Sequence, residues 1–206
     1  MMNTPIKALF LDMGGVILTN GWGSGSRKLA AEKFSLDLND LNDRHKLAFD
    51  TYESGKMTLN EYLDYTVFYT PRTFSRETFT EFMYQQSQPL EEMLQFVQKL
   101  KKQYGIKIFA LNNEGRELND YRIKQFQLDT FIDGFISSAI VKLRKPDKEI
   151  YTLALDIAFV NPDEALYFDD RLIFVQVARS LGIQGIHHTS VEETRQQLLP
   201  YGLSVS

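Results

Sequence analysis

The sequence has no cysteine among its 206 residues. Disulfides, thiolate metal sites and cysteine nucleophiles are therefore excluded. No apolar run approaches the roughly 18 residues that cross a bilayer, and the first residues lack the basic and apolar segments of a signal peptide. From these absences we expect a cytoplasmic protein with no membrane partner.

The sequence also lacks a basic excess and a glycine-rich phosphate loop. Its formal net charge is −4 and its pI is about 5.5, so no positive field of the whole chain attracts nucleic acid. Neither G-x-G-x-x-G nor G-x-x-x-x-G-K-[ST] occurs. The three histidines, His45, His187 and His188, fit no metal-ligand spacing. We therefore expect no nucleic-acid partner and no histidine metal site.

What the sequence does contain is an alternation of short apolar runs and amphipathic segments. The apolar runs are typical of strands buried on both faces of a parallel sheet, and they cover residues 8–11, 106–111, 135–137, 165–168 and 183–186. Helical patterns cover about 90–104, 114–126, 147–159, 172–181 and 191–199. This order predicts an α/β fold, with a Rossmann-like parallel sheet as the core and helices on both faces.

Residues 20–88 interrupt this alternation, because they contain no good strand pattern. Helices are predicted over 27–34, 38–54, 59–69 and 76–86, and the third begins with the capping box TLNE at 58–61. The glycine-rich segment 21–26 predicts a flexible link into this region. We therefore predict an α/β core domain of residues 1–19 and 89–206, with a small all-helical cap domain of residues 20–88 inserted after the first strand.

Acidic residues follow two of the predicted strands. Asp12 ends the first run and precedes Gly14 and Gly15, and Asp169 and Asp170 follow the fourth. The carboxyl ends of parallel strands form the ligand crevice of such sheets, and glycines let backbone N–H groups approach an anion. Crowded carboxylates need protons or a cation, and an all-oxygen set favours Mg²⁺. One aspartate of the pair could also cap the next helix, which is compatible with a metal site.

Lys145 lies directly before Pro146, which holds it extended and directs its side chain away from the following helix. A solvated surface lysine is the alternative, but beside an acidic metal site the ammonium would neutralise a phosphoryl oxygen. A carboxylate nucleophile, Mg²⁺ and a lysine are together what phosphoryl transfer to a carboxylate requires. The residues therefore point to a phosphoryl-transfer site.

Four segments in this order resemble the motifs of the haloacid dehalogenase-like (HAD) hydrolase superfamily, in the capped subgroup with a small helical cap (subfamily IA-like). They are LFLDMGGV at 9–16, LNN at 111–113, RKPD at 144–147 and YFDD at 167–170. The resemblance implies that Asp12 is the nucleophile that forms an aspartyl-phosphate and that Lys145 holds Asp12 and the phosphoryl group. Mg²⁺ would be bound by Asp12, the carbonyl of Gly14 and Asp170, with Asp169 direct or through water.

The resemblance also implies the substrate contacts. Backbone N–H groups at Gly14 and Gly15 would bind phosphoryl oxygens, and Asn112 would do so where the family usually has Ser or Thr. Asn113 is expected beside the substrate. Trp22 is either a lid over the site or a packing residue between the domains. Further cap candidates are Arg27, Tyr52 and Lys56.

Gly14 is the main departure from the family pattern, because most family phosphatases have an aspartate there as the general acid–base. Such a group contributes roughly 10²–10⁴-fold, so its loss predicts slow turnover or a good leaving group. Asn112 in place of Ser or Thr alters the pocket, whereas Phe174, in place of a polar residue, is expected to pack against the core. The leading hypothesis is a Mg²⁺-dependent phosphatase of a small phosphorylated metabolite.

Two alternatives stay open. The first is a non-catalytic phosphate- or metal-binding protein on the same fold. The second is a dehalogenase, in which Asp12 attacks carbon without a metal. The adjacent Asp169 and Asp170 argue against the dehalogenase, because their charge density calls for a cation.

Overall fold

The computed structural model describes residues 5–205 of the chain, and its centre is a parallel sheet of five strands in the order β3-β2-β1-β4-β5. The strands are β1 (Ala8–Leu11), β2 (Lys107–Asn112), β3 (Gly134–Ser137), β4 (Ala165–Asp169) and β5 (Gln184–His187). All four residues of β1 are buried, as expected for the middle strand of a covered sheet. The predicted α/β fold class is therefore confirmed.

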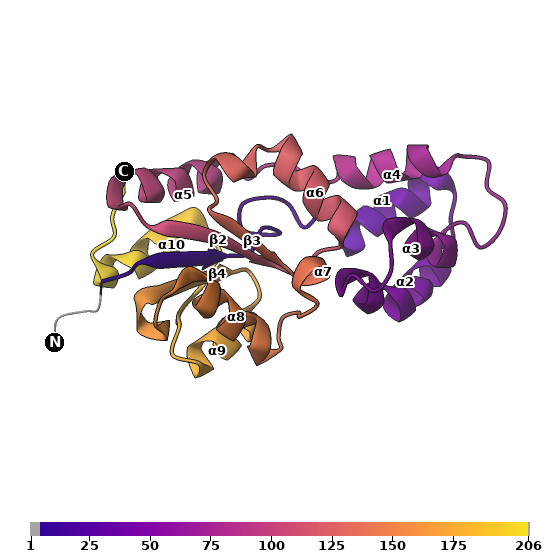
Figure 1. Ribbon diagram of the computed structural model, residues 1–206. Coiled ribbons are helices and arrows are strands. Elements are labelled where there is room, and N and C mark those ends of the chain that lie inside the picture. Colours follow the sequence, from indigo (N-terminus) through magenta and orange to yellow (C-terminus); the bar gives the residue numbers. More distant parts are fainter. Residues whose placement is uncertain (1–4, 206) are drawn as a thin grey trace.

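Helices cover both faces of the sheet (Figure 1). Leu9 and Leu11 of β1 pack in one apolar cluster with α5 (Glu91–Tyr104) and α10 (Val191–Leu198). Phe10 points to the opposite face and packs in a second cluster with α8 (Lys148–Ala158) and α9 (Leu172–Ser180). The period of two along β1 thus divides the core into two layers, and the carboxyl edge of the sheet is left open for a site.

The helices of the inserted segment form a third apolar cluster, away from the sheet (Figure 1). They are α1 (Ser24–Phe34), α2 (Leu38–Glu53), α3 (Leu59–Thr66) and α4 (Arg76–Gln85). This cluster is rich in aromatic rings, which include Trp22, Tyr52, Tyr62 and Phe79. The segment therefore has a core of its own, while the domain boundaries at residues 20 and 88 stay a prediction.

Several element ends differ from the predicted ones. The predicted link 21–26 is shorter, because α1 begins at Ser24, and the predicted helix 59–69 ends at Thr66. The strands β2 and β4 each run one residue further and include Asn112 and Asp169. The helix α6 (Arg116–Gln125) begins two residues late, so that Glu114 lies in a loop. A short helix, α7 (Ser138–Val141), was not predicted.

The end of α2 rests on α7 and on the loop that follows it. Ser138 Oγ donates a hydrogen bond to the Glu53 carbonyl at 2.7 Å, and Arg144 Nη2 pairs with the Glu53 carboxylate at 2.5 Å. Gly55 follows directly and has φ +63°, and a Cβ atom there would overlap the carbonyl oxygen of Ala139. The helical segment and α7 therefore meet in close backbone contact at this point.

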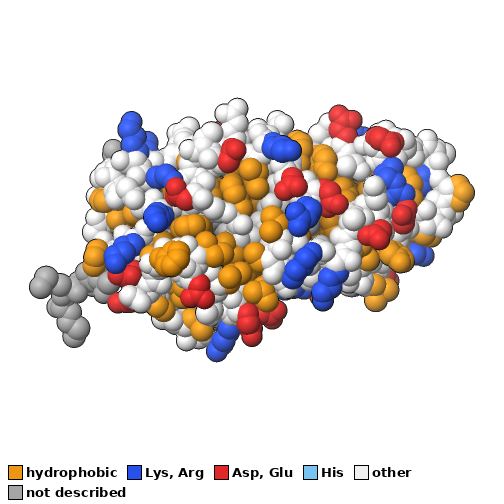
Figure 2. All heavy atoms as spheres, viewed as in Figure 1, with side chains coloured by type: hydrophobic (Ala, Val, Ile, Leu, Met, Phe, Trp, Pro, Cys, Tyr) orange, Lys and Arg blue, Asp and Glu red, His pale blue; other side chains and the backbone are white. Residues whose placement is uncertain are grey.

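The described residues include no helix that is both long and apolar enough to cross a membrane. On the face shown in Figure 2, Lys and Arg side chains are interspersed with Asp and Glu side chains. Such mixed charge gives this face no extended field of one sign.

The close contact at Gly55 predicts a difference between two glycines. Gly105 has a similar φ of +66°, but a Cβ atom there would meet open space. We expect Gly105→Ala to cost about 1–2 kcal/mol for the left-handed backbone, and Gly55→Ala to cost roughly 1–3 kcal/mol more through overpacking. Urea unfolding of both variants measures these free energies. An equal loss of stability in the two variants would show that the Ala139 carbonyl moves aside without cost.

The neutral form of His45 is predicted to stabilise the helical segment. Trp22 Nε1 donates to the Tyr62 hydroxyl, whose oxygen lies 2.8 Å from His45 Nδ1. Because Trp22 must donate, the hydroxyl hydrogen is available for His45, whose neutral Nδ1 can accept it. Burial lowers the pKa of His45 from 6.5 to about 4, with repulsion from Arg27 adding to the shift.

The unfolded chain therefore takes up this proton at a higher pH than the folded chain, and stability should fall as the pH drops from about 6.5 through 4. Urea midpoints across this range should decrease, and the decrease should be smaller in His45→Gln, whose amide oxygen can still accept. An identical pH dependence in the two proteins would contradict the assignment.

Candidate active site

The predicted nucleophile, lysine and Asp pair lie together at the carboxyl edge of the sheet. β1 and β4 are paired in parallel, so that Asp12 lies beside Asp169, the last residue of β4. Lys145 reaches between them from the loop before α8. Its Nζ lies 2.7 Å from Asp169 Oδ2 and 3.3 Å from Asp12 Oδ1. The sheet order reverses at this pair of strands, which is where such folds bind ligands.

Burial and the charges of their neighbours set the pKa values of Asp12 and Lys145. Burial raises the pKa of Asp12 to about 7, and Asp169 and Asp170 add to the rise, whereas Lys145 opposes it. Burial by itself would lower the pKa of Lys145, but the carboxylates of Asp12 and Asp169 outweigh it and raise this pKa above its usual value. One ammonium thus faces three carboxylates, and a cation would offset the remaining negative charge.

The three carboxylates fit a metal ion. Asp12, Asp169 and Asp170 each offer an oxygen within 4.8 Å of the others. Asp170 Oδ1 is buried without a hydrogen-bond partner among residues 5–205, which is costly for a carboxylate. Both oxygens of Asp169 are bonded, Oδ2 to Lys145 and Oδ1 to the N–H of Arg171. The donors therefore suit a hard ion such as Mg²⁺, with Asp170 Oδ1 as the unpartnered oxygen of the cluster.

Gly15 lies in the turn after Asp12, where its role differs from the predicted contact with a phosphoryl oxygen. Gly15 has φ +76°, and a Cβ atom there would overlap the carboxylate of Asp170. Its N–H donates to the carbonyl of Leu18 at 2.7 Å, and the N–H of Met13 donates to Asp12 Oδ1 at 2.9 Å. The N–H of Gly15 is thus used within the turn and not offered to a phosphoryl oxygen. Glycine is required here because Asp170 packs against it.

Asn112 and Asn113 line the cavity but are also bonded within the protein. Asn112 Nδ2 donates to Asn119 Oδ1 at 3.2 Å, and Asn112 Oδ1 accepts from Ser137 Oγ at 2.8 Å. Asn113 clamps the backbone of Lys145, because its amide donates to the Lys145 carbonyl and accepts from the Lys145 N–H, both at 2.8 Å. Asn113 thus positions the lysine, and Asn112 keeps one amide hydrogen for a ligand.

Trp22 lies at the cavity wall and within the core of the helical segment. It lines the cavity, and it packs in the aromatic cluster of the helical segment, where its ring meets Phe79 edge-on at 5.7 Å. The other cap candidates, Arg27, Tyr52 and Lys56, are not part of the cavity wall.

Phe174 does more than the predicted core packing. It is buried against the sheet, but it also lines the cavity. Its ring lies 5.1 Å from Lys145 Nζ and 5.6 Å from Arg171 Cζ. The expectation for Phe174 was therefore incomplete, because its ring face also stabilises two cations of the site.

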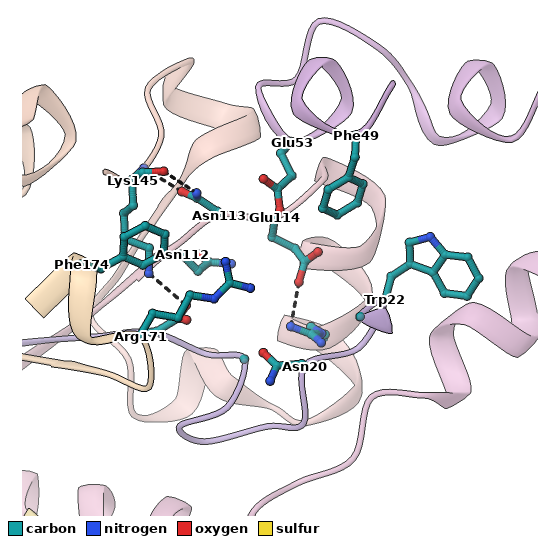
Figure 3. Close-up of a pocket in the computed structure, with 14 residues that line it drawn as sticks. Asn20, Trp22, Phe49, Glu53, Asn112, Asn113, Glu114, Lys145, Arg171 and Phe174 are labelled. Carbon is teal, nitrogen blue, oxygen red and sulfur yellow. Dashed lines mark hydrogen bonds and ion pairs between the residues drawn. The ribbon is translucent and has the colours of Figure 1, made fainter. Parts of the chain in front are cut away.

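Further charged side chains line the cavity, whose volume is about 90 Å³ (Figure 3). They are Glu53 from α2, Glu114 from the loop after β2, Arg122 from α6, and Arg171 after β4. The sequence analysis missed all four as site residues. Only Arg171 carried a usable signal, because it directly follows the Asp pair, while the other three come together only in the folded chain.

Arg122 connects the cavity wall to both ends of the helical segment. It is 1% exposed, and its Nη1 pairs with Glu114 Oε2 at 2.7 Å. Its Nε donates to Ser87 Oγ at 3.0 Å and its Nη2 to the carbonyl of Thr19 at 2.9 Å. A Cβ atom on Gly21 would overlap this guanidinium. Arg122 thus fixes both connections between the helical segment and the sheet.

The comparison with protein families agrees with this geometry. The model of the haloacid dehalogenase-like hydrolase family matches residues 6–182, a range that includes Asp12, Lys145 and the Asp pair. The chain belongs to this family. It is therefore a HAD-like hydrolase, and the resemblance seen in the four motifs is confirmed.

Curated relatives of this HAD-like hydrolase include phosphatases. The sesquiterpene phosphatase astK of Aspergillus oryzae is 27% identical over 96% of this chain and 97% of its own length. The phosphorylated carbohydrates phosphatase of Thermotoga maritima is 30% identical over 48% of this chain and 44% of its own length. These names support a phosphoric monoester hydrolase.

Solved structures share the fold. A HAD family enzyme of Bacteroides thetaiotaomicron, in complex with magnesium and inorganic phosphate, has a TM-score of 0.74 at 21% identity, with coverage of 90% of this chain and 96% of that chain. The L-2-haloacid dehalogenase of Xanthobacter autotrophicus has a TM-score of 0.63 at 17% identity, with coverage of 95% and 83%. At these identities the likeness concerns the fold alone.

The carboxylate cluster predicts that Mg²⁺ stabilises this HAD-like hydrolase. At a hundredfold excess over Kd the gain is about 2.7 kcal/mol, which is roughly 5–10 °C in Tm for a chain of this size. Asp170→Asn should abolish the Mg²⁺-dependent shift and raise the Tm of the metal-free protein, because it removes one of three repelling charges.

The matched control is Asp156→Asn, at an exposed position on α8. Mg²⁺ should raise the Tm of this variant as much as that of the wild type. Thermal unfolding with and without Mg²⁺ measures both effects. A full shift in Asp170→Asn would contradict the assignment of Asp170 as a ligand.

Proposed function

We propose that this HAD-like hydrolase is a Mg²⁺-dependent phosphatase that hydrolyses a small phosphate ester through an aspartyl-phosphate. The observation that carries the proposal is the position of Asp12, 3.3 Å from Lys145 at the wall of a small cavity and within a carboxylate cluster that suits a cation. The phosphatase relatives support the class of reaction.

In this proposal the Asp12 carboxylate attacks phosphorus, and Lys145 neutralises charge on the phosphoryl oxygens. Asp169 holds Lys145, with the Tyr167 hydroxyl as a second donor to the same carboxylate. Asn113 fixes the lysine backbone.

Asp12, the carbonyl of Gly14 and Asp170 would hold Mg²⁺, with Asp169 acting through water. The bound ion would offset the negative charge shared by the carboxylates and the phosphoryl group.

The wall towards the helical segment would surround the leaving group. Residues 20–88 form the proposed cap domain, and Trp22 and Glu53 contribute its side of the cavity. A volume of about 90 Å³ suits the phosphoryl group and a small part of the ester. The remaining Asn112 amide hydrogen would bind a phosphoryl oxygen.

A non-catalytic phosphate- or metal-binding protein is the second candidate. Two observations favour it, namely that Gly14 supplies no proton and that Asn112 is bonded to Asn119 and Ser137. A dehalogenase is less well supported, because its reaction needs no cation, whereas Asp170 Oδ1 is buried without a partner among the described residues.

The proposal predicts hydrolysis of p-nitrophenyl phosphate with Mg²⁺ and its loss on chelation. Asp12→Asn removes the carboxylate that attacks phosphorus and should lower kcat by at least ~10³-fold. Asp156→Asn, at an exposed position outside the cavity wall, should retain wild-type turnover. Binding of phosphate and Mg²⁺ without turnover of any ester in a broad panel would favour the non-catalytic candidate.

A further inference from the structure

The reaction needs a proton for the leaving group, and Gly14 has no side chain to give it. Glu114 is a carboxyl in the same cavity as Asp12. It lies in the loop between β2 and α6, is 7% exposed, and is anchored by its backbone N–H, which donates to Ser138 Oγ at 3.0 Å. Figure 3 shows its side chain between those of Glu53 and Asn20, on the side of the cavity that Phe49 and Trp22 line.

Arg122 lies close both to Glu114 and to the place where an aspartate side chain at residue 14 would begin. Its Nη1 lies 2.7 Å from Glu114 Oε2, and the same Nη1 lies 3.8 Å from where a Cβ atom on Gly14 would be. The Glu114 carboxyl and a Cβ atom on residue 14 would thus both neighbour the same Arg122 nitrogen. Glu114 therefore approaches, from another part of the chain, the region that the usual acid would occupy.

We propose that Glu114 is the general acid–base of this reaction, in place of the carboxyl that Gly14 lacks. The proposal rests on the phosphatase function proposed above. It assigns the proton that Gly14 cannot supply to a carboxyl that lines the same cavity as Asp12.

The proton balance follows in two steps. When an Asp12 oxygen bonds to phosphorus and the bond from phosphorus to the ester oxygen breaks, the neutral Glu114 carboxyl gives its proton to that oxygen and an alcohol leaves. In the second step the Glu114 carboxylate takes a proton from water as the water oxygen bonds to phosphorus. The bond from phosphorus to Asp12 then breaks, and inorganic phosphate, free Asp12 and neutral Glu114 result.

The surroundings of Glu114 suit both protonation states. After proton donation the carboxylate pairs with Arg122. Before it, Arg122 stays in place through its bonds to Ser87 and the Thr19 carbonyl. Burial raises the pKa of Glu114 to about 7; the nearby Glu53 and Asp12 contribute, whereas Arg122 and a backbone hydrogen bond from Gly115 oppose the rise. An acid–base group works best when its pKa lies near the working pH.

The alternative is that Glu114 only balances the charge of Arg122 and keeps the fold together. The two roles differ in how they depend on the leaving group. p-Nitrophenolate leaves without a proton, whereas an alkyl alkoxide needs one. A proton donor therefore matters for release of an alkyl alcohol but not for release of p-nitrophenol, and it matters again for hydrolysis of the phosphoenzyme.

The test is Glu114→Gln, which keeps a hydrogen-bond acceptor for Arg122, measured by rapid quench with Mg²⁺ on p-nitrophenyl phosphate and on glycerol phosphate. We expect a burst of about one equivalent of p-nitrophenol followed by slow turnover, because the first step survives. Alcohol release from glycerol phosphate should fall by about 10²–10⁴-fold with no burst. Equal losses in the first step for both esters would overturn the proposal.

Two further variants sharpen the test. Glu53→Gln changes the other glutamate of the cavity and should leave the ratio of the two first-step rates as in the wild type. Gly14→Asp should raise the rate of glycerol phosphate hydrolysis of the Glu114→Gln variant by at least ~10-fold. In the wild-type background the same substitution should raise this rate by a smaller factor. An equal factor in both backgrounds would show independent sites and overturn the proposal.

The failure of the proposed function gives a different result. Wild-type protein that turns over neither ester and forms no phosphoenzyme would overturn both proposals. Wild-type turnover with equal first-step losses in Glu114→Gln would overturn the role of Glu114 alone.

Discussion

The buried ammonium of Lys145 is the constraint on which the site depends. A charge that is 1% exposed is stable only with close partners, and Asp12 and Asp169 supply them from neighbouring strands. Asn113 holds the backbone of Lys145 through two hydrogen bonds. The Tyr167 hydroxyl donates a further hydrogen bond to Asp169. The charge of one side chain thus fixes the arrangement of three strands and a loop.

A second buried cation, Arg122, ties the helical segment to this site. Its bonds to Thr19 and Ser87 hold both connections, and its pairing with Glu114 places a carboxyl in the cavity. Because removing either partner of a buried pair leaves an uncompensated charge, the connections and the cavity wall cannot change independently. The same contact that orients the helical segment therefore also sets the electrostatics next to Gly14.

Much of the fold could be predicted because its signals are local. Apolar runs predicted all five strands, and Asp12 and the Asp pair were found at strand ends, where parallel sheets gather ligands, whereas Lys145 was found directly before a predicted helix. The misses were of three kinds. Element ends shifted by a few residues, as at Asn112 and Glu114, and the short helix α7 and four charged cavity residues were not predicted. The N–H of Gly15, predicted to bind a phosphoryl oxygen, donates within the turn. Hydrogen-bond partners of this kind are not encoded in a residue's type.

The sequence by itself determined the α/β class, the helical insertion and the identity of the charged residues at the sheet edge, because each depends on periodicity or on a position next to a strand. Only the tertiary structure decided that Asp170 packs on Gly15, that Asn112 is tied to Asn119 and Ser137, and that Glu114 meets Arg122 beside Gly14. These pairings join segments whose approach is set by the packing of helices on the sheet, and sequence spacing does not record such distances.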